Sequence, residues 1–281
     1  MAIVRRVVKK VGLRRAAAPE EASEVLTLPT ERTKPCGALQ DYSILIYGKK
    51  KIGKTTLTSM FQNAFHALCE PGGKALALFS RPVRNWLDLR TYIQLVVKSK
   101  FYKNAVIDTT DYSYNYALKY TCGKLVINHP SDEAWGKGWR AVIEEYEKVL
   151  NPLLHSGKGV IFISHSKEVE IKEEDGGTYN FTTSTLSGQA KELLEGVVDI
   201  WACYTYEKGK RILIIQGDET VDAGHRCEGR FLYTDGTPIK RIPMGNSKEE
   251  AYTNFVAAFE NRLARPSGEG AVKKKIILKR S

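Results

Sequence analysis

One eight-residue stretch, residues 48–55, limits the fold of this chain more than any other feature of its sequence. It reads Gly-Lys-Lys-Lys-Ile-Gly-Lys-Thr and matches the pattern G-x-x-x-x-G-K-T at every position. A short apolar run at 43–47 precedes it, as a buried parallel strand would, and Leu57, Met60 and Phe61 follow at helical spacing. Strand, glycine loop and helix in this order predict a phosphate-binding P-loop.

The chemistry of such a loop gives each part a role. The backbone N–H groups and the N-terminus of the following helix form an anion site for phosphates. Lys54 is expected to reach the β- and γ-phosphates of ATP, and the Thr55 hydroxyl to hold Mg²⁺. The three lysines before Ile52 contact phosphate or DNA, or are solvated. The expected ATP-binding residues are Gly48, Lys49, Lys50, Lys51, Ile52, Gly53, Lys54, Thr55 and Thr56.

Length and composition indicate a globular protein without a membrane span. The 281 residues, 42% of them hydrophobic, can bury one sizeable core and leave room for a small second unit. No stretch approaches the ~18–20 apolar residues that a membrane span needs. The five cysteines are scattered and include no C-x-x-C pair, which favours reduced thiols and a cytoplasmic location.

The net charge of +11 has an uneven origin. Residues 1–15 carry six cations and residues 273–280 carry five, with no acid in either segment, so residues 16–272 sum to zero. Basic tails favour a polyanionic partner, above all a nucleic acid. Two alternatives stay open: both tails are solvated ends, or the front tail is a transit peptide or a membrane-surface helix.

Apolar runs and helical patterns alternate along the chain, which predicts a mostly parallel sheet with helices on both faces. Strands are expected at 43–47, 65–69, 104–108, 158–164, 197–206 and 210–217, and helices at 54–62, 86–98, 138–155, 187–195 and 248–263. We divide the chain into a basic tail and linker (1–40), a core (41–245), a C-terminal helix (246–265) and a basic tail (266–281). The apolar stripe of the last helix is expected to face the core.

Three further polar side chains stand where strands of such a sheet end. Asp108 closes an apolar strand in the Walker B manner and is expected to bind Mg²⁺. Thr109 follows it where many ATPases have a glutamate, so a base for water must come from elsewhere. Glu70, after the second strand, can orient the attacking water, and His165, after the fourth, can contact the γ-phosphate. Each also has a structural alternative, as a turn residue or a satisfied core side chain.

Together these residues resemble the RecA-like ATPase core, and most closely the phage-encoded RecA-like ATPases of the fourth type of the Sak group. The resembling segments are 47–56, 70–76, 104–108, 136–139, 159–165 and 189–199, within residues 40–235. The resemblance implies ATP-dependent action on single-stranded DNA in recombination, repair or replication. It further implies a homo-oligomeric ring or filament in the host cytoplasm, with a single-strand-binding or annealing protein as a further partner.

The same resemblance implies which segments touch DNA and which residue reaches a neighbouring subunit. Residues 112–137 and 166–187 match the DNA-contacting loops, although both could be ordinary exposed loops. The glycine-containing, charged stretch 166–187 is expected to form a long surface hairpin or loop. A stretch at 224–231 matches the motif that reaches a neighbour's ATP, with Arg230 the better candidate and Arg226 the second. The expected DNA-contacting residues are Tyr112, Tyr114, Tyr116, Lys119 and Trp135 in the first loop, and Lys167, Lys172, Tyr179 and Phe181 in the second.

Two other functions remain open from the sequence alone. A P-loop kinase for small molecules or nucleotides needs no water-activating glutamate and usually has an arginine-rich lid. A nucleotide-gated DNA-binding adaptor would bind ATP tightly and turn it over slowly. Stimulation of ATP hydrolysis by single-stranded DNA distinguishes the predicted ATPase from both.

Overall fold

The computed structural model describes residues 28–172 and 176–266. Both basic tails, as far as residue 27 and from residue 267 onward, lie outside the described residues, so their expected roles stay predictions. The chain divides after Pro35, and everything described below belongs to the unit that begins at Cys36. This unit therefore starts five residues before the expected boundary at Asp41.

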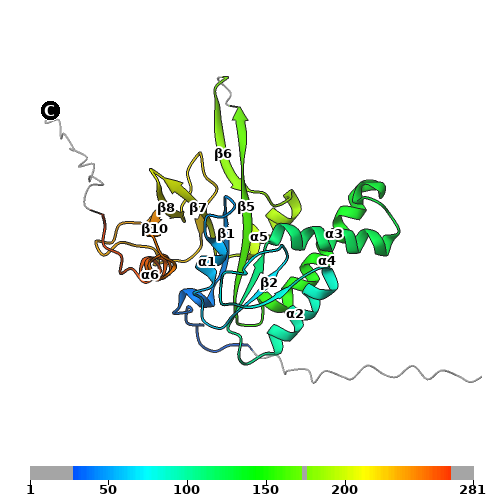
Figure 1. Cartoon of the computed structure of the whole chain (residues 1–281), viewed down its shortest axis with the longest axis horizontal. Helices are drawn as coiled ribbons and strands as arrows, with labels where there is room; N and C mark the ends of the chain where they lie inside the picture. Colours follow the sequence, from blue (N-terminus) through cyan, green and yellow to red (C-terminus); the bar gives the residue numbers. More distant parts are fainter. Residues whose placement is uncertain (1–27, 173–175, 267–281) are drawn as a thin grey trace, which may run out of the picture. The chain divides into compact units, whose positions relative to one another are not determined.

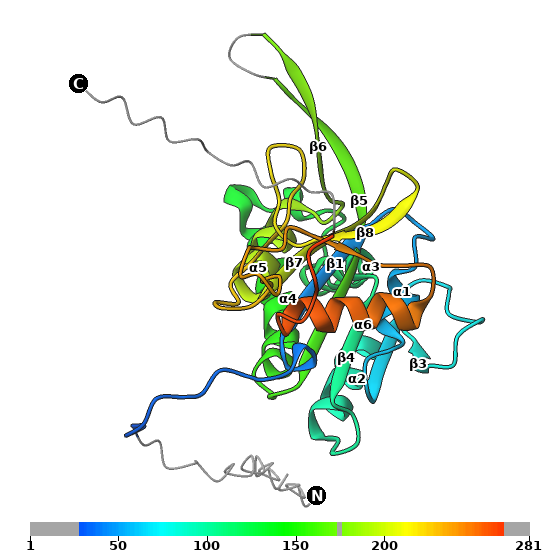
Figure 2. The same ribbon diagram turned by 90° about the vertical axis from the view of Figure 1, so that its left-hand side faces the viewer.

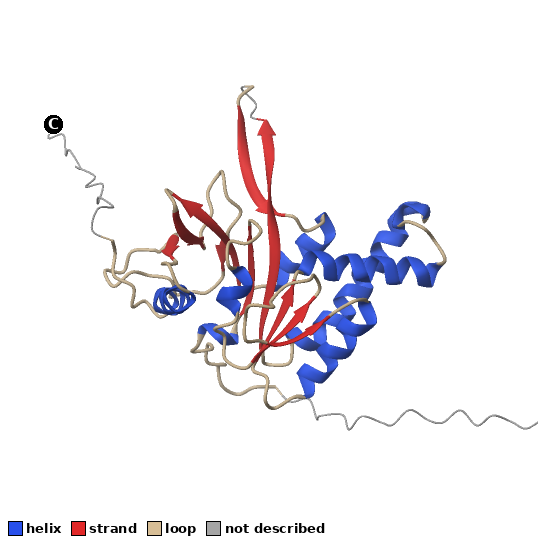
Figure 3. Cartoon of the chain, viewed as in Figure 1, coloured by secondary structure: helices blue, strands red, loops and turns tan. Residues whose placement is uncertain are grey.

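A mixed sheet, mostly parallel, forms the centre of the fold (Figure 1; Figure 3). Its strand order is β10-β8-β7-β1-β5-β4-β2-β3. Neighbours from β7 to β3 pair in parallel, whereas β8 and β10 pair antiparallel. The parallel strands are β1 (Ser43–Gly48), β2 (Ala64–Leu68), β3 (Phe79–Pro82), β4 (Asn104–Asp108), β5 (Gly159–Lys172) and β7 (Ile200–Glu207). The others are β6 (Thr178–Ser184), β8 (Lys210–Ile214), β9 (Gly224–His225) and β10 (Arg241–Pro243).

Helices cover both faces of this sheet, as the sequence predicts. Alternate residues of β1 feed two separate cores, because successive side chains of a strand point to opposite faces. Leu45 and Tyr47 join the core under α2 (Trp86–Lys98), α3 (Thr110–Leu125), α4 (Lys137–Leu154) and α5 (Gly188–Val197). Ile44 and Ile46 join the core with α1 (Lys54–Thr58) and α6 (Lys248–Phe259), and Figure 2 shows α6 crossing in front of the strands. Three short 3₁₀ turns complete the described elements: Leu39–Asp41, Pro130–Asp132 and Ala134–Gly136.

Most expected elements are confirmed within a few residues, and α2 is confirmed at both ends. The helix expected at 54–62 is shorter and ends at Thr58. Four elements were missed: the 16-residue helix α3 and the short strands β3, β9 and β10. The expectation of a loop over 112–137 is therefore wrong, since α3, two 3₁₀ turns and the start of α4 occupy most of it. The apolar stripe of α6 does face the core, where Phe255 and Phe259 are buried.

The fourth strand differs from expectation in a way that matters for function. Instead of ending near Ser164, β5 continues to Lys172 and pairs there with β6 as an antiparallel hairpin. Figure 1 shows this hairpin leaving the sheet beyond the ends of the other strands. The long surface hairpin expected at 166–187 is thus present, and its first strand is an uninterrupted extension of the central sheet. Among the described helices, none is long and apolar enough to cross a membrane.

Candidate nucleotide-binding site

The P-loop runs from the end of β1 into α1, and two glycines fix its path. A Cβ atom on Gly48 would stand 2.1 Å from the Tyr204 carbonyl oxygen of the neighbouring strand β7. Only glycine allows β1 and β7 to approach that closely where the loop leaves the sheet. Gly53 has φ +111°, a left-handed conformation that directs the chain into the first turn of α1.

Lys54 begins α1, and its ammonium group turns back over the loop. Its Nζ donates hydrogen bonds to the carbonyl oxygens of Gly48 at 2.7 Å and Lys49 at 3.0 Å. The side chain is buried, and burial lowers the pKa of Lys54 to about 8, opposed in part by the negative charges of Asp108 and Glu70. The lysine is thus a desolvated cation that lacks a carboxylate partner within the described residues, as a site for an incoming phosphate requires.

Thr55 and Asp108 meet beside this lysine. The Thr55 Oγ1 donates a 2.6 Å hydrogen bond to Asp108 Oδ2. Burial raises the pKa of Asp108, while the hydrogen bond from Thr55 opposes that rise. A hydroxyl and a carboxylate are hard oxygen donors, and Mg²⁺ in nucleotide sites uses one or two such groups together with phosphate oxygens and water. These two residues therefore fit the Mg²⁺ that a P-loop ATPase usually binds with its nucleotide.

Glu70 and His165 face each other: Glu70 lies just after the carboxyl end of β2, and His165 lies in β5 where the parallel pairing of that strand with β1 ends. His165 Nε2 lies 3.3 Å from Glu70 Oε1, and both side chains are mostly but not fully buried. The backbone before Glu70 is fixed on two sides: Cys69 N donates to the Asp108 carbonyl at 2.6 Å, and the Tyr116 hydroxyl donates to the Cys69 carbonyl at 2.8 Å. A carboxylate on an anchored segment, beside the phosphate loop, is placed to orient a water molecule.

These groups enclose one cavity of about 330 Å³. Neither Gly48, Lys49 nor Ile52 lines it: Lys49 pairs instead with Glu168 of the hairpin at 3.9 Å, and the Ile52 side chain is buried in the core. The other expected ATP-binding residues do line it, together with Glu70, Asp108 and His165, so the structure brings these residues together as the sequence analysis expects. The lining consists of Lys50, Lys51, Gly53, Lys54, Thr55, Thr56, Glu70, Pro71, Asp108 and His165.

Comparison with known proteins gives the family. A family model described as "AAA domain" matches residues 40–227, which is more than half of the chain. The chain belongs to this AAA domain family. It is therefore an AAA-type P-loop ATPase domain, and its P-loop lines the cavity at Lys54.

Two other comparisons add little to this assignment. No curated protein matches the sequence. A solved structure from "Structural and biochemical analysis of a prototypical ATPase from the type III secretion system of pathogenic bacteria" is similar at 13% identity and a TM-score of 0.40. The match covers 59% of this chain and 52% of that one, so the AAA domain described here spans about half of that ATPase.

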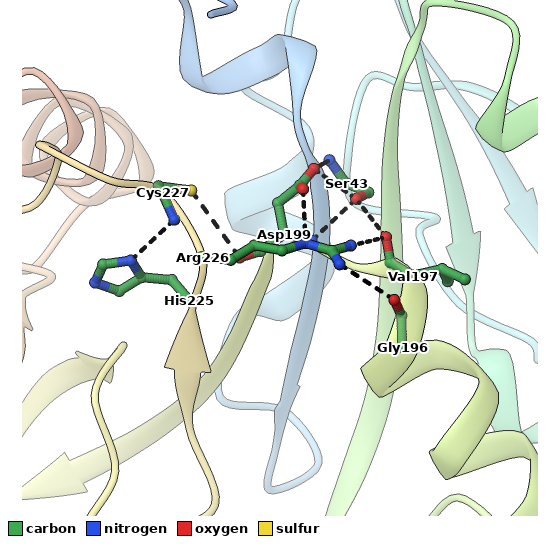
Figure 4. Close-up of polar contacts among 7 residues, drawn as sticks. All are labelled: Ser43, Gly196, Val197, Asp199, His225, Arg226 and Cys227. Carbon is green, nitrogen blue, oxygen red and sulfur yellow. Dashed lines mark hydrogen bonds and ion pairs between the residues drawn. The ribbon is translucent and has the colours of Figure 1, made fainter.

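Both candidate arginines for a neighbouring subunit lie away from the cavity. Arg226 is held within its own chain: it pairs with Asp199 at 3.0 Å and donates to the carbonyl oxygens of Gly196 and Val197 (Figure 4). Arg230 is freer, with its guanidinium 4.7 Å from the centre of the Phe259 ring and one long hydrogen bond to the Cys36 carbonyl. Of the two, only Arg230 could reach another subunit without breaking an ion pair.

Of the residues in 112–137 that are expected to contact DNA, some are exposed and others are buried or bonded within the protein. Tyr114 is buried against Tyr146, and the Tyr116 hydroxyl anchors the Glu70 segment, so neither is available as a stacking platform. The expectation fails there because α3 turns these side chains into the protein. Tyr112 and Trp135 remain exposed.

In the β5–β6 hairpin, the pairing register separates the four expected residues. Residues directly opposite each other in a ladder share a face, and successive residues alternate. Lys167, Tyr179 and Phe181 lie on one face with Val169 and Ile171, whereas Lys172 lies on the other with Glu168 and Glu170. One face of the hairpin is therefore aromatic and apolar.

Proposed function

We propose that this AAA domain hydrolyses ATP with Mg²⁺ and couples that reaction to binding of single-stranded DNA, as the resemblance to phage recombination ATPases implies. One observation carries the proposal. His165, which faces Glu70 in the ATP site, stands in the strand that continues without a break into the exposed hairpin.

The proposed roles follow from the positions of the side chains. Lys54 neutralises charge on the β- and γ-phosphates, and Thr55 and Asp108 hold the Mg²⁺ that supplies further charge neutralisation when it is bound. Glu70 accepts a proton from the water that attacks the γ-phosphorus, while the β–γ bridging oxygen leaves with the electron pair of the broken bond. His165 keeps the Glu70 carboxylate in place.

Coupling to DNA rests on the contacts around the hairpin base. Thr185, just after β6, donates its backbone N–H to the His165 carbonyl at 2.9 Å and its hydroxyl to Asp111 at the start of α3. Lys49 of the P-loop pairs with Glu168 of β5. The contacts of Thr185 and Lys49 therefore link the phosphate site directly to the base of the hairpin. The aromatic face of the hairpin suits the stacking of unpaired bases.

Assembly into a ring or filament is part of the proposal, with Arg230 reaching the ATP site of the next subunit. The head-to-tail interface that such a contact needs is the kind that builds closed rings or open filaments. Action in a host cytoplasm beside a single-strand-binding or annealing protein extends the same proposal, and it rests on the sequence resemblance.

The deciding experiment measures ATP turnover by the full chain with Mg²⁺, with and without a thymidine oligonucleotide. The proposal predicts turnover that rises with single-stranded DNA and is lost in Lys54→Ala. Transfer of the γ-phosphate to a nucleotide or small molecule, without DNA stimulation, would identify a kinase instead. Tight ATP-dependent DNA binding with almost no turnover would identify a nucleotide-gated adaptor.

A further inference from the structure

One end of the sheet carries a segment with a strong excess of positive charge. Residues 71–103 contain seven cations (Lys74, Arg81, Arg84, Arg90, Lys98, Lys100 and Lys103) and one acid, Asp88, so they carry a net +6. The zero sum over residues 16–272 conceals this segregation. The segment includes β3, which ends the strand order and, among the described strands, pairs only with β2 (Figure 2).

Two phenylalanine rings lie exposed within this segment. Phe79 of β3 and Phe101 of the loop before β4 are 53% and 51% exposed, and their ring centres are 5.2 Å apart, edge to face. Tyr102 packs against both and against Phe65 of the core. The pair is therefore supported from below, while much of each ring remains open to solvent.

Four cations lie within three residues of Phe79 or Phe101 in the sequence, whereas residues 71–103 contain a single acid, Asp88. Arg81 lies two residues beyond Phe79 on the same face of β3, and Lys100 and Lys103 flank Phe101 and Tyr102. These three and Lys98 are exposed, and none has an ion-pair partner within residues 28–172 and 176–266. Burial, and then the positive charge of Lys103, lower the pKa of the nearby Lys158.

The loop that presents Phe101 is held in place. Lys158 Nζ donates to the carbonyl oxygens of Ser99 at 2.7 Å and Tyr102 at 2.8 Å. The Ser99 hydroxyl oxygen accepts hydrogen bonds from the backbone N–H groups of Phe101 and Tyr102. A ligand that binds here therefore meets a loop and a ring pair that are already in place, so little ordering of the backbone opposes binding.

We propose that Phe79, Arg81, Lys98, Lys100, Phe101 and Lys103, the β3-edge surface, bind single-stranded nucleic acid. Nucleic-acid bases can stack on exposed aromatic rings, and nearby cations can bind the phosphates that link those bases. The rings lie near the amino-terminal ends of β3 and β4, whereas the ATP cavity lies at the carboxyl-terminal ends of the parallel strands. The β3-edge surface is thus separate from both the ATP site and the β5–β6 hairpin, and its binding does not require hydrolysis.

The test measures binding of fluorescein-labelled oligothymidine to the full chain by anisotropy, over a range of salt concentrations and without nucleotide. Phe79→Ser with Phe101→Ser should weaken binding by about 5-fold or more for each ring lost. Lys100→Glu with Lys103→Glu should lower the log–log salt slope by about 1.4, at about 0.7 for each phosphate contact. Leu87→Ser with Tyr206→Ser, and Lys148→Glu with Lys240→Glu, are matched exposed controls outside the segments expected to contact DNA, and they should bind as wild type does.

Photocross-linking of an iodouracil oligonucleotide to the unmodified protein gives a second readout that does not depend on how variants fold. Cross-linked peptides should include residues 79–103. Wild-type binding by both ring and charge variants, or cross-links confined to other regions, would overturn the proposal. So would binding of poly-glutamate or anionic vesicles in place of oligothymidine. If ATP turnover does not depend on DNA and these cross-links still form, the proposed coupling of hydrolysis to DNA is wrong, but nucleic-acid binding by the β3-edge surface is supported.

Discussion

The most consequential single residue is Lys54, because its charge is maintained in a buried position. With its pKa near 8, the free protein loses the Lys54 proton as the pH rises from 7 to 9, whereas bound phosphates favour the charged form. We therefore expect ATP binding at pH 9 to take up a proton and to weaken by up to about tenfold per pH unit above 8. Calorimetry in two buffers of different ionisation enthalpy measures this uptake.

Lys50→Ala removes a neighbouring lysine of the loop and should leave that proton uptake in place. An ATP affinity that is constant between pH 7 and 9.5, with no proton uptake, would contradict a titrating Lys54. Above pH 8 the terminal phosphate of ATP is already ionised, so the protein is the source of any change there.

Glu70 provides the second test at this scale. Glu70→Gln keeps the shape of the side chain but removes the base, so ATP should bind with near-normal affinity while turnover falls by about 10²–10⁴-fold. His165→Asn should lower turnover by a smaller factor, because it loosens Glu70 without removing it. If Glu70→Gln turns over as fast as wild type, Asp111, whose charge also acts on Lys54, becomes the candidate base.

The sequence predicted the side chains of the site far better than it predicted the contacts that hold them in position. Lys54, Thr55 and Asp108 stand in motifs whose chemistry is local, and the alternating strand pattern was enough to bring Glu70 and His165 to the same edge. The Tyr116 hydroxyl reaches a carbonyl 47 residues earlier in the chain, and no local pattern specifies such a contact. Tyr116 was expected to stack on DNA bases, whereas in the structure its hydroxyl holds the Cys69 carbonyl in place.

Among the elements, α3 shows why a helix can be missed. Its aromatic and polar residues do not form a clear apolar stripe, and its stability depends on tertiary contacts such as the Ser113 and Tyr146 hydroxyls at 2.9 Å. The hairpin was predicted more successfully, because charged and glycine-containing sequence between apolar runs is typical of one. That β5 would supply its first strand without interruption was not evident, since Ser164-His165 reads as a strand end.

The hairpin carries the third prediction. Tyr179→Ser with Phe181→Ser should weaken single-stranded DNA binding by about 5-fold or more and reduce stimulation of turnover, because two stacking rings leave one face. Glu170→Ser with Asn180→Ser alters a directly opposed pair on the other face and serves as the control. Anisotropy and turnover measured on the same preparations test both variants. Equal loss in the two pairs would mean that the hairpin acts through its general stability, not through its aromatic face.

At the scale of the whole molecule, the position of Arg230 makes assembly testable. An Arg230→Ala subunit keeps its own ATP cavity but offers no arginine, whereas a Lys54→Ala subunit offers the arginine but has no working cavity. Mixtures of the two inactive proteins should regain part of the turnover, because some interfaces pair an intact cavity with an intact arginine. Arginines supplied in this way contribute on the order of 10³–10⁵ in rate.

Arg226→Ala gives the matched comparison. Because Arg226 holds Asp199 and two carbonyl oxygens of its own chain, its loss should lower the melting temperature, and Arg230→Ala should not do so to the same degree. Mixtures that stay inactive although mixed oligomers form would rule out Arg230 as the arginine supplied by a neighbour.

The unbroken course of β5 also has a mechanical consequence. Lys172 lies seven positions beyond His165, which is about 23 Å of extended strand, so the hairpin is a long arm whose base lies at the cavity. A rotation of only about 10° at His165 would move Lys172 by about 4 Å. If the hairpin binds single-stranded DNA as proposed, a displacement of that size would exceed the rise between stacked bases.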